Sequence, residues 1–316
     1  MSGKHLGPQI VPADSLGIAA AAERILAGEP VAVATETVYG LAARADSPEA
    51  VAAIYAAKGR PGFNPLIVHV SGLAQAETLA DFDARARALA AKFWPGPLTL
   101  VLPLRESARI APAVTAGLPT IALRCPAHPA MRGLLAASAL PLAAPSANRS
   151  GGVSPTSAAH VARSLEGRIG LVLDGGLCPG GLESTIVALR ADGTWELLRP
   201  GPVTHTELAG ELGAASERSP SSGIEAPGQL ASHYAPGKPV RLGASKAGSD
   251  EFLIGFGLLG GDYNLSPRGD LAEAAARLYA ALHEAAAAPQ PRIAVAALPD
   301  EGIGAALNDR LRRAAA

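Results

Sequence analysis

Aromatic side chains are scarce in this sequence. Five Phe, five Tyr and two Trp make up 4% of its 316 residues, although hydrophobic residues reach 48%. A core of this composition must be built mainly from Ala, Val, Leu and Ile. Cysteine is scarcer still, because only Cys125 and Cys178 are present. They lie far apart and match no metal-binding spacing such as CxxC, so we predict two small buried or half-buried thiols.

Surplus charge and long hydrophobic runs are also missing. The formal net charge of −1 argues against a strongly electrostatic grip on nucleic acid, although a local basic patch remains compatible with it. No apolar run approaches the roughly 20 residues that a membrane-spanning helix needs. Lys4 and His5 precede no continuous apolar segment of the kind found in a signal peptide. We therefore expect a soluble, cytoplasmic protein that contacts no membrane.

Apolar stretches of strand length alternate with Ala-rich helical stretches through the first two-thirds of the chain. Strands are predicted at 31–35, 66–70, 98–102, 120–124, 140–144, 170–173, 184–189 and 194–198. Helices are predicted at 16–27, 48–57, 83–93 and 157–165. Gly28 is a helix stop, and Ser47 is a candidate N-cap. The alternation predicts an α/β domain with a twisted, mixed sheet rather than a helical bundle.

The composition changes at residue 211. From there to residue 238 the chain is rich in Ser, Pro, Gly and Ala, which is typical of a linker. Beyond it, strands at 240–242, 252–256 and 293–295 alternate with helices at 272–286 and 303–312. We therefore predict an α/β domain over residues 1–210, a linker over 211–238 and a small α/β domain over 239–316. A typical domain has about 150 residues, so a chain of 316 residues agrees with two domains.

The second domain contains a literal GxGxxG motif, from Gly255 to Gly260, after a predicted strand. A dinucleotide site needs the third glycine to open a helix, with an acidic residue about 20 positions later. Gly261, Asn264 and Pro267 follow instead, which indicates a loop. A Walker A sequence is absent from the whole chain, so nucleotide phosphates would have to be held in another way.

The run KGRPGFNPLIVH, residues 58–69, is the most informative segment. It places Lys58 and Arg60 in a turn, because Pro61 and Gly62 stop any helix there. Residues two apart on an extended turn point the same way, so both cations can converge on one polyanion, such as a phosphate-bearing substrate. The alternative is a pair of solvated cations on a loop.

Four further clusters of hydroxyl and amide side chains stand at the edges of apolar runs. They are TETVYG at 35–40, PSAN at 145–148, SPT at 154–156 and ESTIV at 183–187. Together with KGRPGFNPLIVH they closely resemble the YrdC/Sua5 family of L-threonylcarbamoyladenylate synthases. The resemblance covers residues 10–203 and continues through HYAP at 233–236 into the C-terminal domain, as in the longer Sua5 form. It implies a YrdC-like, open, mixed sheet with a large cleft, and a small Rossmann-like C-terminal domain.

The resemblance implies an enzyme that joins L-threonine, bicarbonate and ATP to give threonylcarbamoyladenylate and pyrophosphate. The product serves the t6A modification of tRNA adenosine 37, through a downstream threonylcarbamoyl transferase. Mg²⁺ is expected to arrive with ATP, held by phosphates and water rather than by a protein cage, and no metal ligand is assigned.

Two other functions stay open for this fold. One is a double-stranded RNA-binding translation regulator, which the net charge disfavours, although a weak RNA contact stays compatible. The other is a carbamoyl-adenylating maturation enzyme, which normally carries zinc-finger CxxC pairs that this sequence lacks.

Lys58 and Arg60 are the predicted catalytic residues, because the reaction brings two anions together and needs their repulsion neutralised. Lys supplies a compact charge, and Arg supplies a fork for phosphate oxygens. The resemblance implies ATP contacts by Lys58, Arg60, Asn64, Thr120, Ser146, Asn148, Ser154, Arg199 and Tyr234. For Ser146 and Asn148 a local turn is the alternative, and Ser154 could instead begin the following helix.

For the amino acid, the resemblance points to Thr37, His69, Arg124, the Ala144 backbone and Ser184. Arg124 ends a predicted strand and suits the carboxylate, since Arg binds that group bidentately. His69 is assigned a threonine contact rather than the role of general base. Glu36 is left without a role, because a carboxylate beside a polyphosphate would be costly.

Tyr234 is an aromatic residue in a linker otherwise rich in Ser, Pro and Gly. It either pins the linker to the first domain or, as the resemblance implies, belongs to a cover that folds across the cleft and contacts ATP. Such a cover would exclude water from an easily hydrolysed adenylate.

Overall fold

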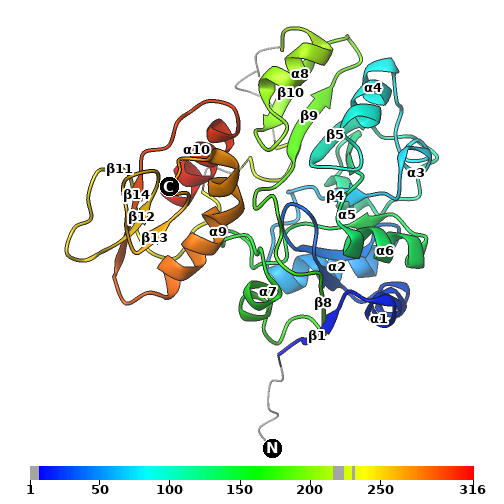
Figure 1. Ribbon diagram of the computed structural model, residues 1–316. Helices are drawn as coiled ribbons and strands as arrows, with labels where there is room; N and C mark the ends of the chain where they lie inside the picture. The colour runs from blue at the N-terminus through cyan, green and yellow to red at the C-terminus, as the bar shows by residue number, and fades with distance from the viewer. Residues whose placement is uncertain (1–6, 216–223, 230–231) are drawn as a thin grey trace, which may run out of the picture.

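The computed structural model describes residues 7–215, 224–229 and 232–316. Its larger body is built on one ten-stranded mixed sheet. In spatial order the strands are β1 (Gln9–Pro12), β8 (Leu171–Asp174), β2 (Val31–Val33), β3 (Gly40–Arg44), β7 (Leu142–Ala143), β4 (Ile67–His69), β6 (Thr120–Arg124), β5 (Leu98–Pro103), β9 (Thr185–Leu189) and β10 (Trp195–Arg199). Eight helices of the described chain accompany this sheet (Figure 1). They are α1 (Ser15–Leu26), α2 (Pro48–Lys58), α3 (Leu73–Ala76), α4 (Ala84–Phe93), α5 (Pro112–Thr115), α6 (Pro129–Ser138), α7 (Ala158–Ser164) and α8 (His205–Leu212).

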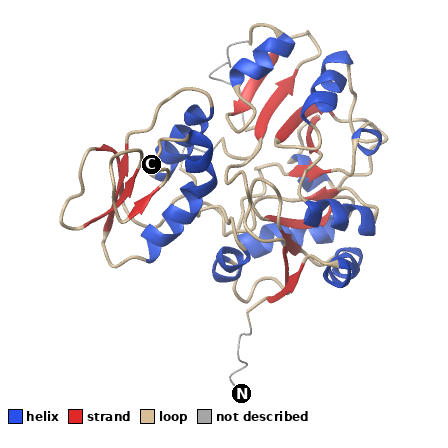
Figure 2. Cartoon of the chain, in the orientation of Figure 1, coloured by secondary structure: helices blue, strands red, loops and turns tan. Residues whose placement is uncertain are grey.

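The smaller body holds four strands in which every neighbouring pair is parallel. In spatial order they are β11 (Val240–Ala244), β14 (Arg292–Ala296), β12 (Glu251–Gly255) and β13 (Tyr263–Asn264), with helices α9 (Leu271–Ala287) and α10 (Ile303–Ala314). The two helices lie between this sheet and the larger body (Figure 2). The predicted α/β class, with a large mixed sheet and a second small α/β unit, is confirmed. Within the described residues, none of the helices is long and apolar enough to cross a membrane.

Small aliphatic side chains dominate the core of the larger body, as the shortage of aromatics requires. Both tryptophans of the sequence lie in this body: Trp195 is fully buried, and Trp94 meets Phe82 edge-on with ring centroids 6.2 Å apart. Cys125 and Cys178 are buried free thiols, so that prediction is confirmed. The second hydrophobic cluster includes Val38 and Leu182 of the larger body together with residues of α9, so the two bodies share a core.

A glycine allows the close approach of the two bodies. Gly181 has a φ of 68°, and a Cβ added there would lie 2.3 Å from the carbonyl oxygen of Ala275 in α9. Any side chain at this position would therefore both strain the backbone and push α9 away.

Several elements escaped prediction, and α6 shows why. Pro129 and Gly133 resemble helix breakers, yet Pro129 occupies the first turn, where its missing N–H costs nothing. His128 caps the helix, because its Nδ1 accepts a hydrogen bond from the N–H of Ala130. Gly133 packs against Ile18 of α1, and a Cβ there would lie 2.6 Å from Ile18 Cδ1. The glycine is a packing requirement between α1 and α6 rather than a helix stop.

Two predicted boundaries change in the structure. Lys58 was expected in a turn, but it is the last residue of α2, and the helix ends at Gly59 in a left-handed conformation with φ of 59°. The helix α8 runs to Leu212, so regular structure continues two residues into the segment predicted as linker. Residues 216–223 and 230–231 of that segment lie outside the described residues.

The GxGxxG sequence forms a loop, as predicted. Gly255 ends β12, and Phe256 and Leu259 then pair in an isolated bridge. The Asn264 amide donates to the carbonyls of Gly257 and Leu259, at 3.2 and 3.1 Å. The next helix, α9, begins only at Leu271, so the third glycine opens no helix.

Candidate active site

A cavity in the larger body is lined by residues from the loop before β3, the strands β4, β6 and β10, and by residues 227, 228, 233 and 234. Eight of the fourteen predicted site residues line it: Thr37, Arg60, His69, Arg124, Ala144, Ser146, Arg199 and Tyr234. Five more are buried but are not among the lining residues: Lys58, Asn64, Asn148, Ser154 and Ser184. Thr120 is apart from them, because it begins β6 while Arg124 ends that strand.

Lys58 is fixed by two backbone carbonyls. Its Nζ donates to the oxygens of Ser146 and Asn148, both at 2.5 Å, which ties the end of α2 to the PSAN segment. Burial, with Arg60 nearby, holds the pKa of Lys58 well below its usual value. The ammonium group is therefore a desolvated charge that an incoming anion would stabilise.

Arg60 and Arg199 are buried in the same way. Arg60 donates from Nη2 to the carbonyl of Pro65 at 3.0 Å, and burial lowers its pKa to about 10. Arg199 donates from Nε to the carbonyl of Ser184 at 3.0 Å and from Nη2 to the Ser184 hydroxyl at 3.1 Å. Within the described residues, neither arginine nor Lys58 forms an ion pair with an acidic side chain. Three buried cations without such partners make this end of the cavity a site for a polyanion.

Unsatisfied polar atoms gather around these cations. Among the described residues, Asn64 Oδ1, Asn148 Oδ1 and His233 Nδ1 are buried without a hydrogen-bond partner. Native interiors leave few such atoms unpaired, because each one costs free energy. Their concentration beside Lys58 and Arg60 is the arrangement expected where a ligand completes the hydrogen bonds.

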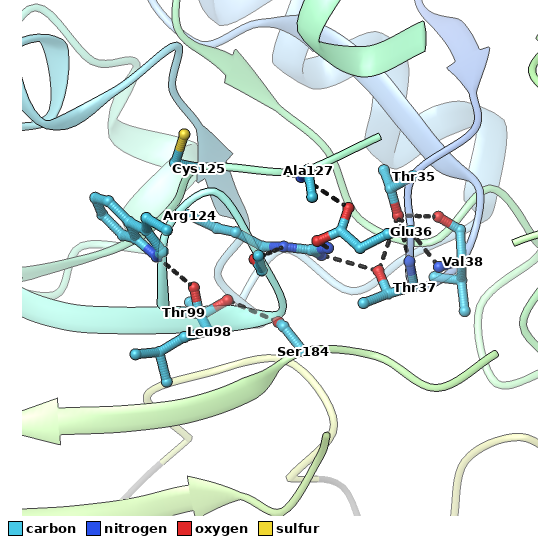
Figure 3. Close-up of polar contacts among 12 residues, drawn as sticks. Thr35, Glu36, Thr37, Val38, Leu98, Thr99, Arg124, Cys125, Ala127 and Ser184 are labelled. Atoms are coloured by element: carbon cyan, nitrogen blue, oxygen red, sulfur yellow. Dashed lines mark hydrogen bonds and ion pairs between the residues drawn. The ribbon is translucent and has the colours of Figure 1, made fainter. Parts of the chain in front are cut away.

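The other end of the cavity centres on Arg124, and Figure 3 shows the polar contacts of this residue. Its guanidinium donates to the Thr37 hydroxyl at 2.9 Å and to the Glu36 carboxylate at 2.5 Å. The Thr35 hydroxyl donates to the carbonyl of Val38 at 2.6 Å, so the Thr37 hydroxyl must donate its own proton to Thr35, 2.8 Å away. Thr37 Oγ1 can therefore only accept a further hydrogen bond from a ligand.

His69 and Ser184 complete this end. His69 pairs in register with Arg124 across β4 and β6, and its Nδ1 is buried without a partner among the described residues. Burial, with the charge of Arg124, lowers the pKa of His69 to about 3, so the ring is neutral near pH 7. The Ser184 hydroxyl lies 2.7 Å from the Thr99 hydroxyl on β5. Arg124 is thus flanked by the Glu36 carboxylate and by the polar side chains of Thr37 and the neutral His69, which suits an amino acid carboxylate.

Comparison with known proteins decides the family. The family described as "Telomere recombination" (Sua5, YciO and YrdC) matches residues 23–201, and "Threonylcarbamoyl-AMP synthase, C-terminal domain" matches residues 203–316. The threonylcarbamoyl-AMP synthase of Bacillus subtilis is 41% identical, over 94% of this chain and 92% of the relative. The chain belongs to the YrdC/Sua5 family.

Structural comparison agrees with this YrdC/Sua5 assignment. The threonylcarbamoyl-AMP synthase of Pyrococcus abyssi is 39% identical over 93% of this chain and 92% of the relative. The crystal structure of P. abyssi Sua5 complexed with L-threonine has a TM-score of 0.89, covering 97% of each chain at 36% identity. Full-length HypF in a phosphate- and nucleotide-bound form shares the fold alone, with 18% identity and a TM-score of 0.52 over 59% of this chain.

In this YrdC/Sua5 chain the described residues 225–229 and 232–235 lie along one side of the cavity. Arg199 Nη1 donates to the carbonyl of Pro227 at 3.3 Å, and Glu225 pairs with Arg190 at 2.7 Å. Tyr234 is fully buried in a left-handed conformation with φ of 63°, a strained state for a tyrosine. Its ring stacks on Tyr279 of α9 with centroids 5.6 Å apart. Tyr234 therefore holds this segment against both bodies while it lines the cavity.

Glu183 is the main site residue of the YrdC/Sua5 chain that sequence reasoning missed. Its carboxylate accepts hydrogen bonds from the Ser154 hydroxyl at 2.5 Å, the Tyr279 hydroxyl at 2.7 Å and Arg310 Nε at 3.0 Å. Burial raises its pKa, but Arg310, Arg199 and the two hydroxyls lower it to about 2. The only available signal was its position beside Ser184, because both partners from the smaller body are distant in the chain.

Proposed function

We infer that this protein is an ATP-dependent L-threonylcarbamoyladenylate synthase. The observation that carries the proposal is a cavity lined at one end by Arg60 and Arg199, with the buried Lys58 close to Arg60, and at the other end by Arg124 and polar side chains; within the described residues none of the first three cations pairs with a carboxylate. The first end suits a triphosphate and the second suits an amino acid carboxylate. Support comes from relatives named threonylcarbamoyl-AMP synthase, which match both bodies, and from the L-threonine bound to P. abyssi Sua5.

The proposed reaction has two steps. The amine of threonine attacks the carbon of bicarbonate, and loss of water leaves a carbamate. A carbamate oxygen then attacks the α-phosphorus of ATP, the bond from that phosphorus to the pyrophosphate oxygen breaks, and pyrophosphate leaves. Both partners of the second step are anions, so the chain contributes mainly by neutralising charge and fixing orientation.

We propose a role for each group. Lys58, Arg60 and Arg199 would bind phosphate oxygens and stabilise the charge that develops on the leaving pyrophosphate. Arg124 would bind the threonine carboxylate, and the lone pair of Thr37 would accept a hydrogen bond from the threonine amine or hydroxyl. Tyr234 and its segment would keep water away from the mixed anhydride.

Mg²⁺ is proposed to enter with ATP. Among the described residues no group of three or more His, Cys, Asp or Glu side chains could hold a metal ion. Glu183, a carboxylate at the cavity wall, is already committed to Arg310. Phosphate oxygens and water would therefore supply most of the ligands, and the ion would neutralise phosphate charge.

The decisive experiment measures pyrophosphate release and identifies the adenylate by mass spectrometry. We expect release only when Mg-ATP, bicarbonate and L-threonine are all present, with no RNA required. Equal release without threonine would overturn the proposal. Release with carbamoyl phosphate in place of threonine and bicarbonate would instead support the carbamoyl-adenylating maturation reaction, and a requirement for duplex RNA would support an RNA-dependent role.

The product is proposed to serve t6A synthesis at tRNA adenosine 37. A threonylcarbamoyladenylate is a mixed anhydride that hydrolyses easily, so it must be passed to a transferase that places the threonylcarbamoyl group on the adenosine amine. Adding such a transferase and an unmodified tRNA to the reaction should give threonylcarbamoylated tRNA, and omission of this protein should abolish it.

A further inference from the structure

Glu36 already places a carboxylate on the arginine that is proposed to bind the substrate. Its Oε1 lies 2.5 Å from Arg124 Nη2, and its Oε2 accepts a hydrogen bond from the N–H of Ala127 at 3.1 Å (Figure 3). The side chains of Arg124 and Glu36 are 4% and 15% exposed. The pair is therefore a built, nearly buried contact rather than a surface ion pair.

The Arg124 guanidinium keeps room for a second anion. It has five N–H groups. One on Nε donates to the carbonyl of Gly96 at 3.2 Å, one on Nη1 to Thr37 and one on Nη2 to Glu36. Within the described part of the chain this leaves one N–H on each terminal nitrogen. Two donors on neighbouring nitrogens are what one further carboxylate needs.

Glu36 is held from its backbone as well. Its carbonyl accepts a hydrogen bond from the N–H of Gly180 at 2.8 Å, and a Cβ at Gly180 would lie 2.8 Å from the same oxygen. The neighbouring Thr35 and Thr37 are buried and bonded to each other. Both ends of the Glu36 side chain are thus fixed, so Glu36 can fix Arg124 in turn.

The charge of Glu36 matters separately from its position. Burial raises the pKa of Glu36, but the charge and hydrogen bond of Arg124, with the Ala127 N–H, bring it below its usual value. Glu36 is therefore an anion near pH 7 and a poor general base. His69, which also faces Arg124, is neutral, and burial raises the pKa of the nearby Cys125 and Cys178 thiols, so they carry no charge near pH 7 either. Glu36 and Arg124 together carry no net charge, whereas Arg124 alone would attract any small polyanion.

We propose that Glu36 is a positioning and specificity-determining residue, which orients Arg124 and cancels its charge so that the pocket accepts one amino acid carboxylate and rejects polyanions. This inference rests on the proposed function, because it takes Arg124 to be the carboxylate partner of threonine. It assigns no chemical step to Glu36.

Two substitutions separate position from charge. Glu36→Ala removes the contact with Arg124, and we expect KM for threonine to rise about 10- to 100-fold while KM for ATP stays within twofold, since one charge-assisted hydrogen bond orients the guanidinium. Glu36→Gln keeps an acceptor for Arg124 but removes the charge. Sulfate should then inhibit competitively with threonine at least 10-fold more strongly than in the wild type. Glu29→Ala is the matched control, because Glu29 forms an exposed pair with Arg24 at 2.7 Å.

Direct binding keeps this test separate from the catalytic proposal. Calorimetric titration with L-threonine measures the same loss of affinity without turnover, so an inactive wild type would count against the proposed function alone. If Glu36→Ala does not fold, Glu36→Gln still reports on charge through sulfate competition. An unchanged threonine affinity in Glu36→Ala, or sulfate inhibition equal to wild type in Glu36→Gln, would overturn the corresponding half of the inference. A parallel rise in KM for ATP would indicate a general structural role instead.

Discussion

The imidazole rings of His160 and His283 stack with their centroids 3.9 Å apart and their planes 27° apart. His160 belongs to α7 of the larger body and His283 to α9 of the smaller one. His283 Nε2 lies 3.1 Å from the carbonyl oxygen of Ser154, so this nitrogen carries the proton. His160 Nδ1 accepts a hydrogen bond from the N–H of Thr156 at 3.3 Å. Two neutral rings thus join the bodies directly behind Ser154, a proposed ATP contact.

Acid should loosen this contact. Burial, with the partner ring and Arg163, lowers the pKa of His160 to about 3, and burial lowers that of His283 to about 4. An unfolded histidine titrates near 6.5, so the unfolded chain binds more protons between about pH 6.5 and 4. The stability from the neutral pair is therefore complete above pH 6.5 and lost as pH falls through this window. The melting temperature should therefore fall as the pH falls from about 6.5 to 4, and it should depend less on pH in the His283→Gln variant. His205→Gln, at an exposed histidine, should leave the profile as in the wild type.

Loss of the Arg310 side chain should destabilise the protein strongly. Arg310 is fully buried on α10, and its removal would leave the buried Glu183 carboxylate without its cation. Arg310→Ala should lower the free energy of unfolding by about 3–5 kcal/mol, measured by chemical denaturation. Arg292→Ala is the comparison, because the Arg292 side chain is half-exposed and its two ion pairs are 3.7 Å long, and it should cost less than about 1 kcal/mol. If both substitutions lowered the free energy of unfolding equally, groups other than Arg310 would have to compensate the buried charge of Glu183.

Lys58→Ala should reduce turnover on the order of 10²–10³-fold, since one donor to developing charge is worth that much in rate. The structure adds a second consequence, because the same substitution removes the Lys58 hydrogen bonds to the Ser146 and Asn148 carbonyls and leaves Ser146 only the N–H of Asn148 as a partner, so it should also lower the melting temperature. Lys92→Ala removes a lysine from an exposed pair with Glu211 and should change neither quantity. Wild-type turnover in Lys58→Ala would remove Lys58 from the phosphate site.

Selectivity among amino acid substrates should depend mainly on the side-chain hydroxyl group of the substrate. Serine lacks only a methyl group, so its kcat/KM should be about 10- to 200-fold below that of threonine. Valine and 2-aminobutyrate lack the hydroxyl and would leave a buried polar atom such as His69 Nδ1 without a partner, so their rejection should be steeper, toward 10⁴-fold. Finding 2-aminobutyrate ahead of serine would show that the pocket selects shape.

Prediction from sequence worked where the signal was local. The strand β6 was predicted with the bounds it has, and Arg124 at its end lines the cavity. The burial of Lys58 was missed, because its carbonyl partners lie about 90 residues further along the chain. The same holds for Glu183, whose cation Arg310 is 127 residues away. The order of the motifs along the chain can indicate which residues belong to a site. It cannot indicate which residue of the other body neutralises a buried charge.

The placement of the two tryptophans has a consequence for spectroscopy. Trp94 and Trp195 both belong to the larger body, while Tyr234, Tyr263 and Tyr279 are the aromatic chromophores of the covering segment and the smaller body that absorb near them. Tryptophan emission therefore reports on one body alone, whereas far-ultraviolet circular dichroism also counts the long helix α9. Coincident denaturation curves from the two signals would mean that the bodies unfold as one cooperative unit. A gap between the curves would measure how far the smaller body can melt while the catalytic sheet stays folded.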